Sequence, residues 1–200
     1  MLRIVSTWID RLVERLTPGR RASLPDRAAA QVRDGARCAA VAALLHDEPS
    51  GPRVLLMKRV DRDGDPWSGH ISLPGGRYQA SDENLLTTAI RETHEELGID
   101  LRGARLIGEL SPLHPRMSGP TGIEVMPFVF LTEAAVEPVC GPEALSAFWL
   151  PLETAASGTL DGTYTYPGST MSFPSWSYDG HIIWGLTMRI LGELITTARS

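Results

Sequence analysis

Three features are scarce in this chain of 200 residues: cysteine, long apolar runs and excess positive charge. Its two cysteines, Cys38 and Cys140, are too few for a disulfide framework and fit no metal-binding spacing. No apolar run approaches the ~20 residues that cross a bilayer. The net charge of −5 provides no basic footprint for nucleic acid. We therefore expect a cytoplasmic protein with no transmembrane segment and no nucleic-acid partner.

The length is that of one domain with a modest extension, and it is enough to bury a core without disulfides. There are no internal repeats or low-complexity tracts, which argues against a repeat scaffold. Proline, glycine and arginine between residues 17 and 35 are typical of a linker around a brief helix. We expect a helical extension and linker over residues 1–35 and the main domain over residues 36–200.

An apolar stripe runs along a predicted helix that ends near Pro18-Gly19. The stripe consists of Val5, Trp8, Ile9, Leu12, Val13 and Leu16. Charged residues interrupt it, so it lacks the uncharged core of a signal peptide. A helix that lies on a membrane surface is one interpretation. Such stripes more often dock onto their own domain or onto a second subunit, so we expect docking or a homodimer.

The rest of the pattern predicts a mixed α/β domain of the α+β kind. Apolar runs bounded by turn residues predict strands over residues 38–45, 54–58, 71–73, 105–110, 125–131 and 148–150. Helical spacing predicts helices over residues 84–97, from near Leu152, and over residues 181–196. The first two strands are expected to form a hairpin. The glycine-rich and aromatic stretch of residues 158–176 is expected to form another hairpin over the functional site.

The predicted helix over residues 84–97 carries several acidic side chains. Its apolar positions are Leu86, Ile90, Thr93 and Leu97, and a neighbouring face carries Glu92, Glu95 and Glu96. Like charges four residues apart cost roughly 0.2–0.5 kcal/mol per pair, so a neutralising cation is favoured. Mg²⁺ takes oxygen ligands and suits a few carboxylates. The alternative for such a helix taken alone is a solvated acidic face.

A glycine turn precedes this helix. Consecutive glycines after Pro74 predict a tight turn with close backbone approach, which leaves amides and carbonyls free to face a ligand. Ser81 or Asp82 is the expected N-cap of the helix that follows. The sequence therefore predicts a strand, a glycine turn and a capped acidic helix in succession.

This succession resembles the Nudix box. The matching positions are Gly76, Glu83, Arg91, Glu92, Glu95, Glu96, Gly98 and Ile99. The loop between Gly76 and Glu83 is one residue longer than the general pattern, so either Glu83 or Asp82 serves as the first acid, and Thr93 replaces an aliphatic residue. The resemblance implies a Nudix fold, a mixed β-sheet sandwiched between α-helices, and a diphosphatase that uses Mg²⁺ or Mn²⁺.

The flanking residues resemble the coenzyme A diphosphatase branch of that family. The run from Leu55-Leu56 to Gly69 and on to Leu73-Pro74-Gly75-Gly76 follows the branch signature, with Leu73 in place of Phe and Asp65 in place of an expected Arg. Residues 178–187 resemble the end of the branch. The resemblance implies cleavage of coenzyme A into 3′,5′-ADP and 4′-phosphopantetheine. The alternatives are another nucleoside diphosphate derivative, such as ADP-ribose, a dinucleotide or an NTP, and a Nudix module that binds nucleotides without hydrolysis.

The resemblance also implies roles for individual residues. Glu92 and Glu96 are the expected principal metal ligands, completed by Glu95 and by the carbonyl of Gly76, and Arg91 is expected to hold a carboxylate through a bidentate pair. The general base is expected to be either a box glutamate or a distant acid on a later loop, for which the candidate is Glu124, equally readable as an exposed polar residue at a strand entrance. Candidate phosphate contacts, each also readable as a surface or strand-end residue, are Arg59, His70, Arg77, His114 and Arg116. Trp67 and Trp176 could stack on adenine, although large aromatics are more often core or rim packing.

Overall fold

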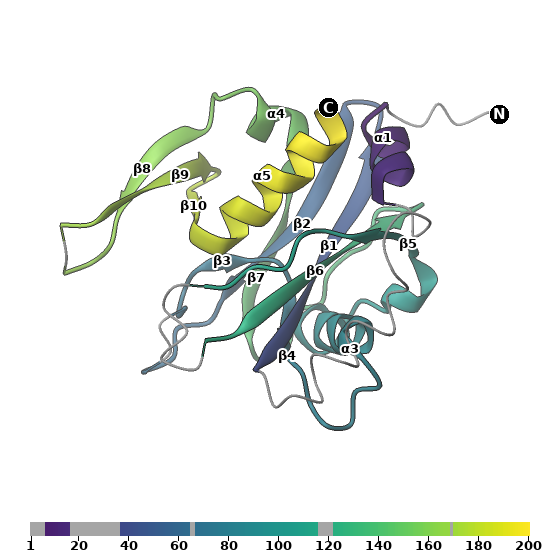
Figure 1. The fold of residues 1–200 in the computed structure, drawn as a ribbon. Helices are drawn as coiled ribbons and strands as arrows, with labels where there is room; N and C mark the ends of the chain where they lie inside the picture. The colour runs from purple at the N-terminus through teal and green to yellow at the C-terminus, as the bar shows by residue number, and fades with distance from the viewer. Residues whose placement is uncertain (1–6, 17–36, 65–66, 116–121, 169) are drawn as a thin grey trace.

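The computed structural model describes residues 7–16, 37–64, 67–115, 122–168 and 170–200. Within these residues, seven strands form the main sheet: β1 (Cys38–Glu48), β2 (Gly51–Arg59), β3 (Ile71–Ser72), β4 (Gly75–Arg77), β5 (Arg105–Glu109), β6 (Glu124–Thr132) and β7 (Ala144–Pro151). Three more form a second sheet: β8 (Asp161–Thr165), β9 (Ser172–Tyr178) and β10 (His181–Trp184). The described helices are α1 (Thr7–Leu16), α3 (Leu85–Leu97), the short 3₁₀ helix η1 (Leu101–Gly103), α4 (Leu152–Ala156) and α5 (Gly185–Arg199) (Figure 1).

Strands β1 and β2 of the main sheet separate after a short paired stretch, and the glycine turn lies between them near the middle of the sheet. Strand β1 pairs with β2 only from Leu45 to Glu48, and from Ala39 to Val41 it pairs instead with β4. Strand β3 continues along β2 on the other side of the split. On its opposite edge β1 runs parallel to β6, whereas the other pairings of the main sheet are antiparallel. The segment from β3 to β4 therefore enters between two diverging strands.

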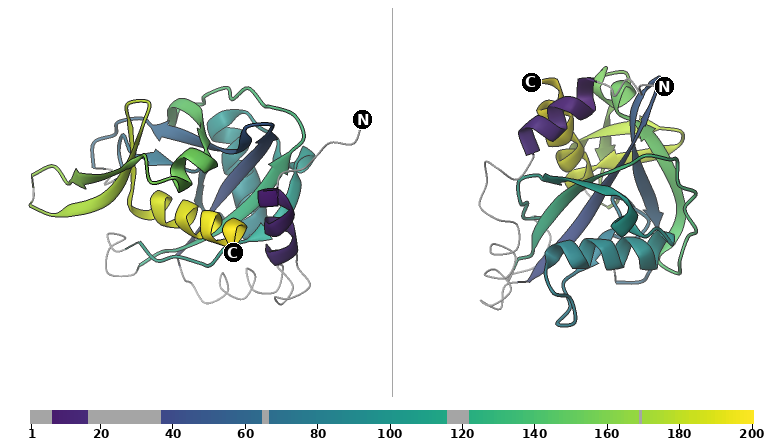
Figure 2. Two further views of the ribbon diagram at one scale, coloured as in Figure 1. Left: turned by 90° about the horizontal axis from the view of Figure 1, so that it is seen from above. Right: turned by 90° about the vertical axis from the view of Figure 1, so that its right-hand side faces the viewer.

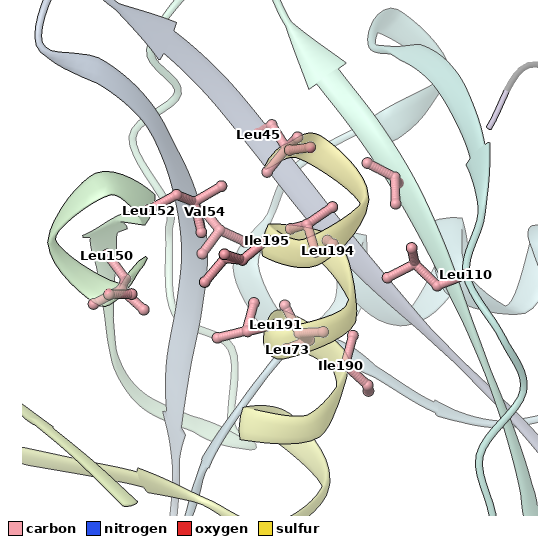
Figure 3. Packing of buried hydrophobic residues seen from close by; sticks show 14 of the residues in the cluster. Leu45, Val54, Leu73, Leu110, Leu150, Leu152, Ile190, Leu191, Leu194 and Ile195 are labelled. Carbon is pink, nitrogen blue, oxygen red and sulfur yellow. The ribbon is translucent and has the colours of Figure 1, made fainter. Parts of the chain in front are cut away.

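Helices cover both faces of the main sheet, as expected for the mixed fold. Helix α3 lies on one face, whereas α5 and α1 lie on the other (Figure 2). The α3 face buries small and aliphatic residues of β1 such as Ala40 and Leu44 against Leu85 of the helix. On the other face, Leu191 and Leu194 of α5 pack among residues of β1, β2 and β7 (Figure 3). This layering holds α3 against the glycine turn.

The N-terminal apolar stripe docks onto its own domain. Trp8, Ile9 and Leu12 of α1 are buried in the same cluster as residues of α5. The guanidinium of Arg11 donates to the carbonyls of Ala198 and Arg199 at the end of α5, at 3.4 and 3.3 Å. Val5, Pro18-Gly19 and the expected linker lie outside the described residues. The expected homodimer stays a prediction.

The prediction of one closing helix over residues 181–196 was wrong at its start. Residues 181–184 form strand β10, which pairs with β9, and the helix begins only at Gly185. The two strands are joined by Asp179-Gly180, both with positive φ (48° and 75°), which is the conformation that a tight hairpin turn requires. This Asp-Gly pair was the overlooked signal. The other elements predicted within the described residues are present, with β7 longer than expected and with the helix after Leu152 confirmed as α4.

None of the helices in the described part of the chain is long and apolar enough to cross a membrane.

Candidate active site

Helix α3 is held at both ends by its own caps. The side chain of Asn84 accepts a hydrogen bond from the backbone N–H of Thr87 at 2.9 Å, and Gly98 ends the helix with a φ of 67°. The prediction of Ser81 or Asp82 as the N-cap was therefore wrong. Asp82 is engaged elsewhere, because it accepts hydrogen bonds from Thr88 and from Arg91. The capping signal was present in the sequence as Asn84, three residues before Thr87.

The buried face of α3 is rotated from the expected one. Leu85, Ala89 and Leu97 are fully buried, whereas Leu86 and Ile90 are only partly so. Thr93 is buried and its hydroxyl donates to the carbonyl of Ala89 at 2.7 Å, which satisfies the polar group at this atypical position. The rotation carries Glu96 to the inner side, where it is 2% exposed. One of the three box glutamates is therefore not on a solvated face.

Glu96 is a buried carboxylate beneath the glycine turn. One of its oxygens accepts the N–H of Gly75 at 2.8 Å, and the other lies 3.9 Å from a guanidinium nitrogen of Arg59. Burial, helped by the nearby charge of Glu92, raises the pKa of Glu96 to about 8, although the hydrogen bond from Gly75 and the charge of Arg59 oppose the shift. Its two partners therefore do not compensate the cost of burying the charge. A cation is the kind of partner that would.

The two glycines permit the close approach of this carboxylate cluster. A Cβ atom on Gly75, whose φ is 149°, would lie 2.2 Å from the carbonyl oxygen of Ala40. A Cβ atom on Gly76 would lie 2.5 Å from the carboxyl carbon of Glu92. At Gly75 the added atom would meet backbone, so only glycine fits there, whereas at Gly76 it would meet the end of the Glu92 side chain, which would have to move away. The β4 backbone is thus directly against the carboxylate of Glu92.

Arg91 is the centre of an ion-pair network. Its guanidinium makes a bidentate pair with Asp82, with N–O distances of 2.8 and 2.9 Å. It also donates to Glu92 at 2.9 Å, to Glu95 at 3.1 Å and to the carbonyl of Arg77 at 3.2 Å. The hydrogen bonds from Arg91 hold the pKa of the Asp82 carboxyl below its usual value. Of the two candidates for the first acid, Asp82 is therefore in the network, whereas Glu83 is exposed.

Replacing Arg91 by Lys is expected to destabilise the protein by about 1–3 kcal/mol, because a lysine cannot make the bidentate pair and leaves buried Asp82 poorly compensated. Urea unfolding measures the loss. The matched control is Arg102→Lys, since Arg102 pairs with Asp100 at 2.9 Å but both side chains are exposed, and its loss of stability is expected to be clearly smaller than that of Arg91→Lys. Equal losses in the two variants would contradict the structural role assigned to Arg91.

Glu143 is a carboxylate near the site that the sequence did not reveal. Its negative charge contributes to raising the pKa of both Glu92 and Glu96. It is paired with Arg62 at 3.1 Å, and its backbone carbonyl accepts the N–H of Val60 at 3.0 Å. Two residues earlier, Gly141 donates to the carbonyl of Glu96 at 2.8 Å. No motif surrounds Glu143 in the sequence, so only the packing of its segment against α3 shows its position.

The candidate phosphate contacts do not all lie together. Arg59 and His70 lie beside each other on β2 and next to β3, because the N–H of Arg59 donates to the carbonyl of His70 at 3.0 Å. Arg77 ends β4 and its side chain is exposed. His114 lies beside Glu124, with 3.4 Å between the ring and the carboxylate. Arg116 lies outside the described residues.

Glu124 lies apart from the network around Arg91. It begins β6 opposite Cys38 of β1, so one strand separates it from β4. One of its carboxylate oxygens is buried and, among the described residues, has no hydrogen-bond partner.

Trp176 is buried in the core around α5 and its indole donates to Asp161 at 3.1 Å, so the suggestion that it stacks on adenine was wrong. Trp67 is partly buried.

In the described part of the chain, no three His, Cys, Asp or Glu side chains converge in positions that could hold a metal ion. The reason is visible in the contacts, because Arg91 binds Glu92 and Glu95 while Glu96 accepts from Gly75. The donor set nevertheless suits a hard divalent cation, since it consists of carboxylate oxygens on one turn of α3. The uncompensated burial of Glu96 is the observation that favours such an ion.

The comparisons with known proteins agree with this geometry. A model of the NUDIX domain matches residues 36–167. The chain is 31% identical over 148 residues to the uncharacterised Nudix hydrolase NudL of Yersinia pestis. This match covers 72% of this chain and 71% of NudL. It is also 52% identical over 63 residues to an uncharacterised Schizosaccharomyces pombe protein, C14C4.10c, and this match covers 30% of the chain but only 19% of that relative.

Solved structures share the fold at low identity. A NUDIX hydrolase from Alicyclobacillus acidocaldarius has a TM-score of 0.56 at 16% identity, covering 80% of this chain and 91% of that one. An Ap4A hydrolase from Caenorhabditis elegans, solved as a binary complex, has a TM-score of 0.51 at 20% identity, covering 60% of this chain and 84% of that one. At these identities the likeness concerns the fold alone.

Proposed function

This chain belongs to the NUDIX domain family and is a Nudix diphosphatase, and we propose that its substrate is coenzyme A or a derivative, cleaved into 3′,5′-ADP and a 4′-phosphopantetheine product. The observation that carries the proposal is where the residues of the branch signature lie in the fold. The signature run forms β2, β3 and β4, and this unit contributes Arg59 and Gly75, the two partners of buried Glu96. The segment that resembles the branch is thus the segment that frames the acidic site.

Hydrolysis of a diphosphate requires a water aimed at one phosphorus and neutralisation of the charge that develops in the transition state. Nudix hydrolases generally use divalent metal ions, and we propose Mg²⁺ or Mn²⁺, which would supply both the activated water and the neutralising charge. Glu92 and Glu96, with Glu95 and the Gly76 carbonyl, are the groups we propose to hold the ion. Arg91 positions Glu92 and Glu95 through its hydrogen bonds.

The chain's other groups have supporting roles in the proposal. We propose that Arg59 neutralises a substrate phosphate, which is supported by its position next to Glu96, and His70 lies beside it. Arg77 and Arg116 stay predictions as further phosphate contacts. Glu124 stays a prediction as general base, supported by its buried, unpartnered oxygen among the described residues. Cytoplasmic localisation is part of the proposal and is supported by the free thiols of Cys38 and Cys140.

A second candidate is the hydrolysis of another nucleoside diphosphate derivative at the same site. The observation that favours it is Asp65, which stands where the coenzyme A signature has an arginine. A nucleotide-binding module without activity is less well supported, because all three box glutamates are retained. Both alternatives are separated from the first by the same experiment.

Turnover with Mg²⁺ or Mn²⁺ is expected to be fastest with coenzyme A in a panel that also holds acetyl-coenzyme A, ADP-ribose, NADH, diadenosine polyphosphates and dNTPs. Product analysis is expected to show 3′,5′-ADP, and chelation by EDTA is expected to remove the activity. A clear preference for ADP-ribose or a dinucleotide would replace the coenzyme A assignment with the second candidate. Metal-independent binding without turnover of any of these compounds would favour the binding module.

A further inference from the structure

The second sheet carries a cluster of aromatic rings around Trp184. Tyr164, Phe173 and Tyr166 have ring centroids 4.5, 5.3 and 6.0 Å from that of Trp184. The imidazole of His70, from the main sheet, meets the same indole edge-on at 5.1 Å. We call these five residues the Trp184 cluster. Its members come from β8 (Tyr164), from the residue that follows β8 (Tyr166), from β9 and β10, and from the residue before β3.

The Trp184 cluster lies on the face of the second sheet that the main core does not use. Strand β10 alternates, so that Ile183 is buried in the core around α5 while Trp184 points to the other side. On β9 the neighbouring core residue is Trp176, which pairs with Ile183. All five rings of the cluster are only partly buried. The cluster therefore presents aromatic surface at the outer face of the sheet and is not simply part of the core.

A chain of contacts connects this surface to the acidic site. Residues opposite each other on antiparallel strands project to the same face, and Arg59 is hydrogen-bonded to His70 at the end of the β2–β3 pair. The guanidinium of Arg59 lies 3.9 Å from the carboxylate of Glu96. The imidazole of His70 touches Trp184. Arg59 and His70, joined through their backbones, thus connect the buried glutamate to the aromatic surface.

We propose that the Trp184 cluster is the stacking site for the nucleobase of the substrate, while the diphosphate occupies the acidic site beside Arg59. This proposal rests on the proposed function, since it assigns one end of the same substrate. A purine base is a flat, polarisable ring, and aromatic side chains provide the matching flat surface. Such a site takes any planar heteroaromatic base without reading its hydrogen-bonding edge. The pantetheine chain has no flat aromatic ring and is assigned elsewhere.

The test compares two ligands that differ only in the base, AMP and ribose 5-phosphate, each titrated calorimetrically into the full-length chain with Mg²⁺. The wild type is expected to bind AMP more tightly. Trp184→Leu is expected to weaken AMP binding by roughly 5- to 150-fold, which is the range of one base–aromatic stack, and to leave ribose 5-phosphate unchanged. Trp184→Phe, which keeps a flat ring, is expected to retain most of the AMP affinity.

Trp149→Leu is the matched control. Trp149 is also partly buried but lies on β7 in the main sheet, where its ring meets His46 at 6.1 Å, and its replacement is expected to change neither affinity. Tyr164→Leu provides a second variant if Trp184→Leu fails to fold, as judged by circular dichroism. Equal weakening of AMP and ribose 5-phosphate, or no weakening of either, would overturn the proposal. A selective loss of 4′-phosphopantetheine binding, titrated in the same way, would overturn it as well, by assigning the surface to the pantetheine half of the substrate.

The outcome does not depend on turnover. If the substrate panel shows no cleavage of coenzyme A while base-dependent binding disappears in Trp184→Leu, the stacking site stands and the coenzyme A assignment fails. If coenzyme A is cleaved and base-dependent binding survives in Trp184→Leu, the stacking site fails and the coenzyme A assignment stands.

Discussion

Glu96→Gln is expected to lose about three orders of magnitude in kcat and, in the absence of metal, to be more stable than the wild type. The activity falls because the amide is a poor ligand for Mg²⁺ or Mn²⁺, and metal-based stabilisation of transition-state charge contributes several kcal/mol, each ~1.4 kcal/mol being tenfold in rate. The amide oxygen can still accept the N–H of Gly75, so the fold is kept. A loss of function with a gain in stability is unusual for a buried substitution.

The stability gain follows from the pKa of Glu96. Burial raises this pKa from 4.5 to about 8, so the folded protein binds the proton more tightly than the unfolded chain. The resulting stability is fully present below about pH 4.5 and is lost as the pH rises through about 8. At pH 9 the metal-free wild type therefore contains an ionised, poorly compensated carboxylate, at a cost of a few kcal/mol. Glutamine has no such cost, so its advantage grows between pH 5 and pH 9.

Thermal melts in EDTA at pH 5, 7 and 9 measure this difference, and melts with added Mg²⁺ are expected to stabilise the wild type but not the variant. The matched control is Glu95→Gln on the same turn of α3, because Glu95 is 55% exposed and its replacement is expected to shift stability by less than about 0.5 kcal/mol. A variant less stable than the wild type at pH 9 would show that Gly75 and Arg59 fully compensate the charge of Glu96.

Gly75→Ala is expected to prevent stable folding. The added Cβ would meet the backbone of β1, at 2.2 Å from the Ala40 oxygen and 2.6 Å from the Val41 Cα, and neither atom can move without breaking the β1–β4 pairing. The φ of 149° adds backbone strain. We expect a loss of more than about 3 kcal/mol, in the range of the severe mechanisms of destabilisation. Expression yield and urea unfolding report it.

Gly180→Ala separates strain from clash. Gly180 also has a positive φ, of 75°, but a Cβ there would meet nothing within 4 Å. Its replacement is expected to cost about 1 kcal/mol, the value typical of an unfavourable backbone conformation alone. If Gly75→Ala cost no more than this control, the close packing of β4 against β1 would not be required for the fold.

The acidic helix and the glycine turn could be predicted because their signals are local. The spacing of Glu92, Glu95 and Glu96 follows from the helical period, and consecutive glycines indicate a close approach wherever they lie in the fold. The docking of the N-terminal stripe was also expected from its apolar pattern. The prediction was wrong at residues 181–184 because two local signals in the sequence indicate different structures there. The apolar residues before Gly185 fit a helix by period, but Asp179-Gly180 turned them into strand β10.

Local signals in the sequence were enough to predict the fold class, the order of most elements and the residues of the acidic box, because each depends on neighbours within a few positions along the chain. Which of those residues are buried, which partners they have and which distant groups join them follows from long-range packing. Glu96 is buried because β4 enters between β1 and β2, Glu143 approaches because its segment packs against α3, and His70 meets Trp184 because two sheets come together. Such contacts depend on long-range strand pairing, which the local period of a sequence does not encode.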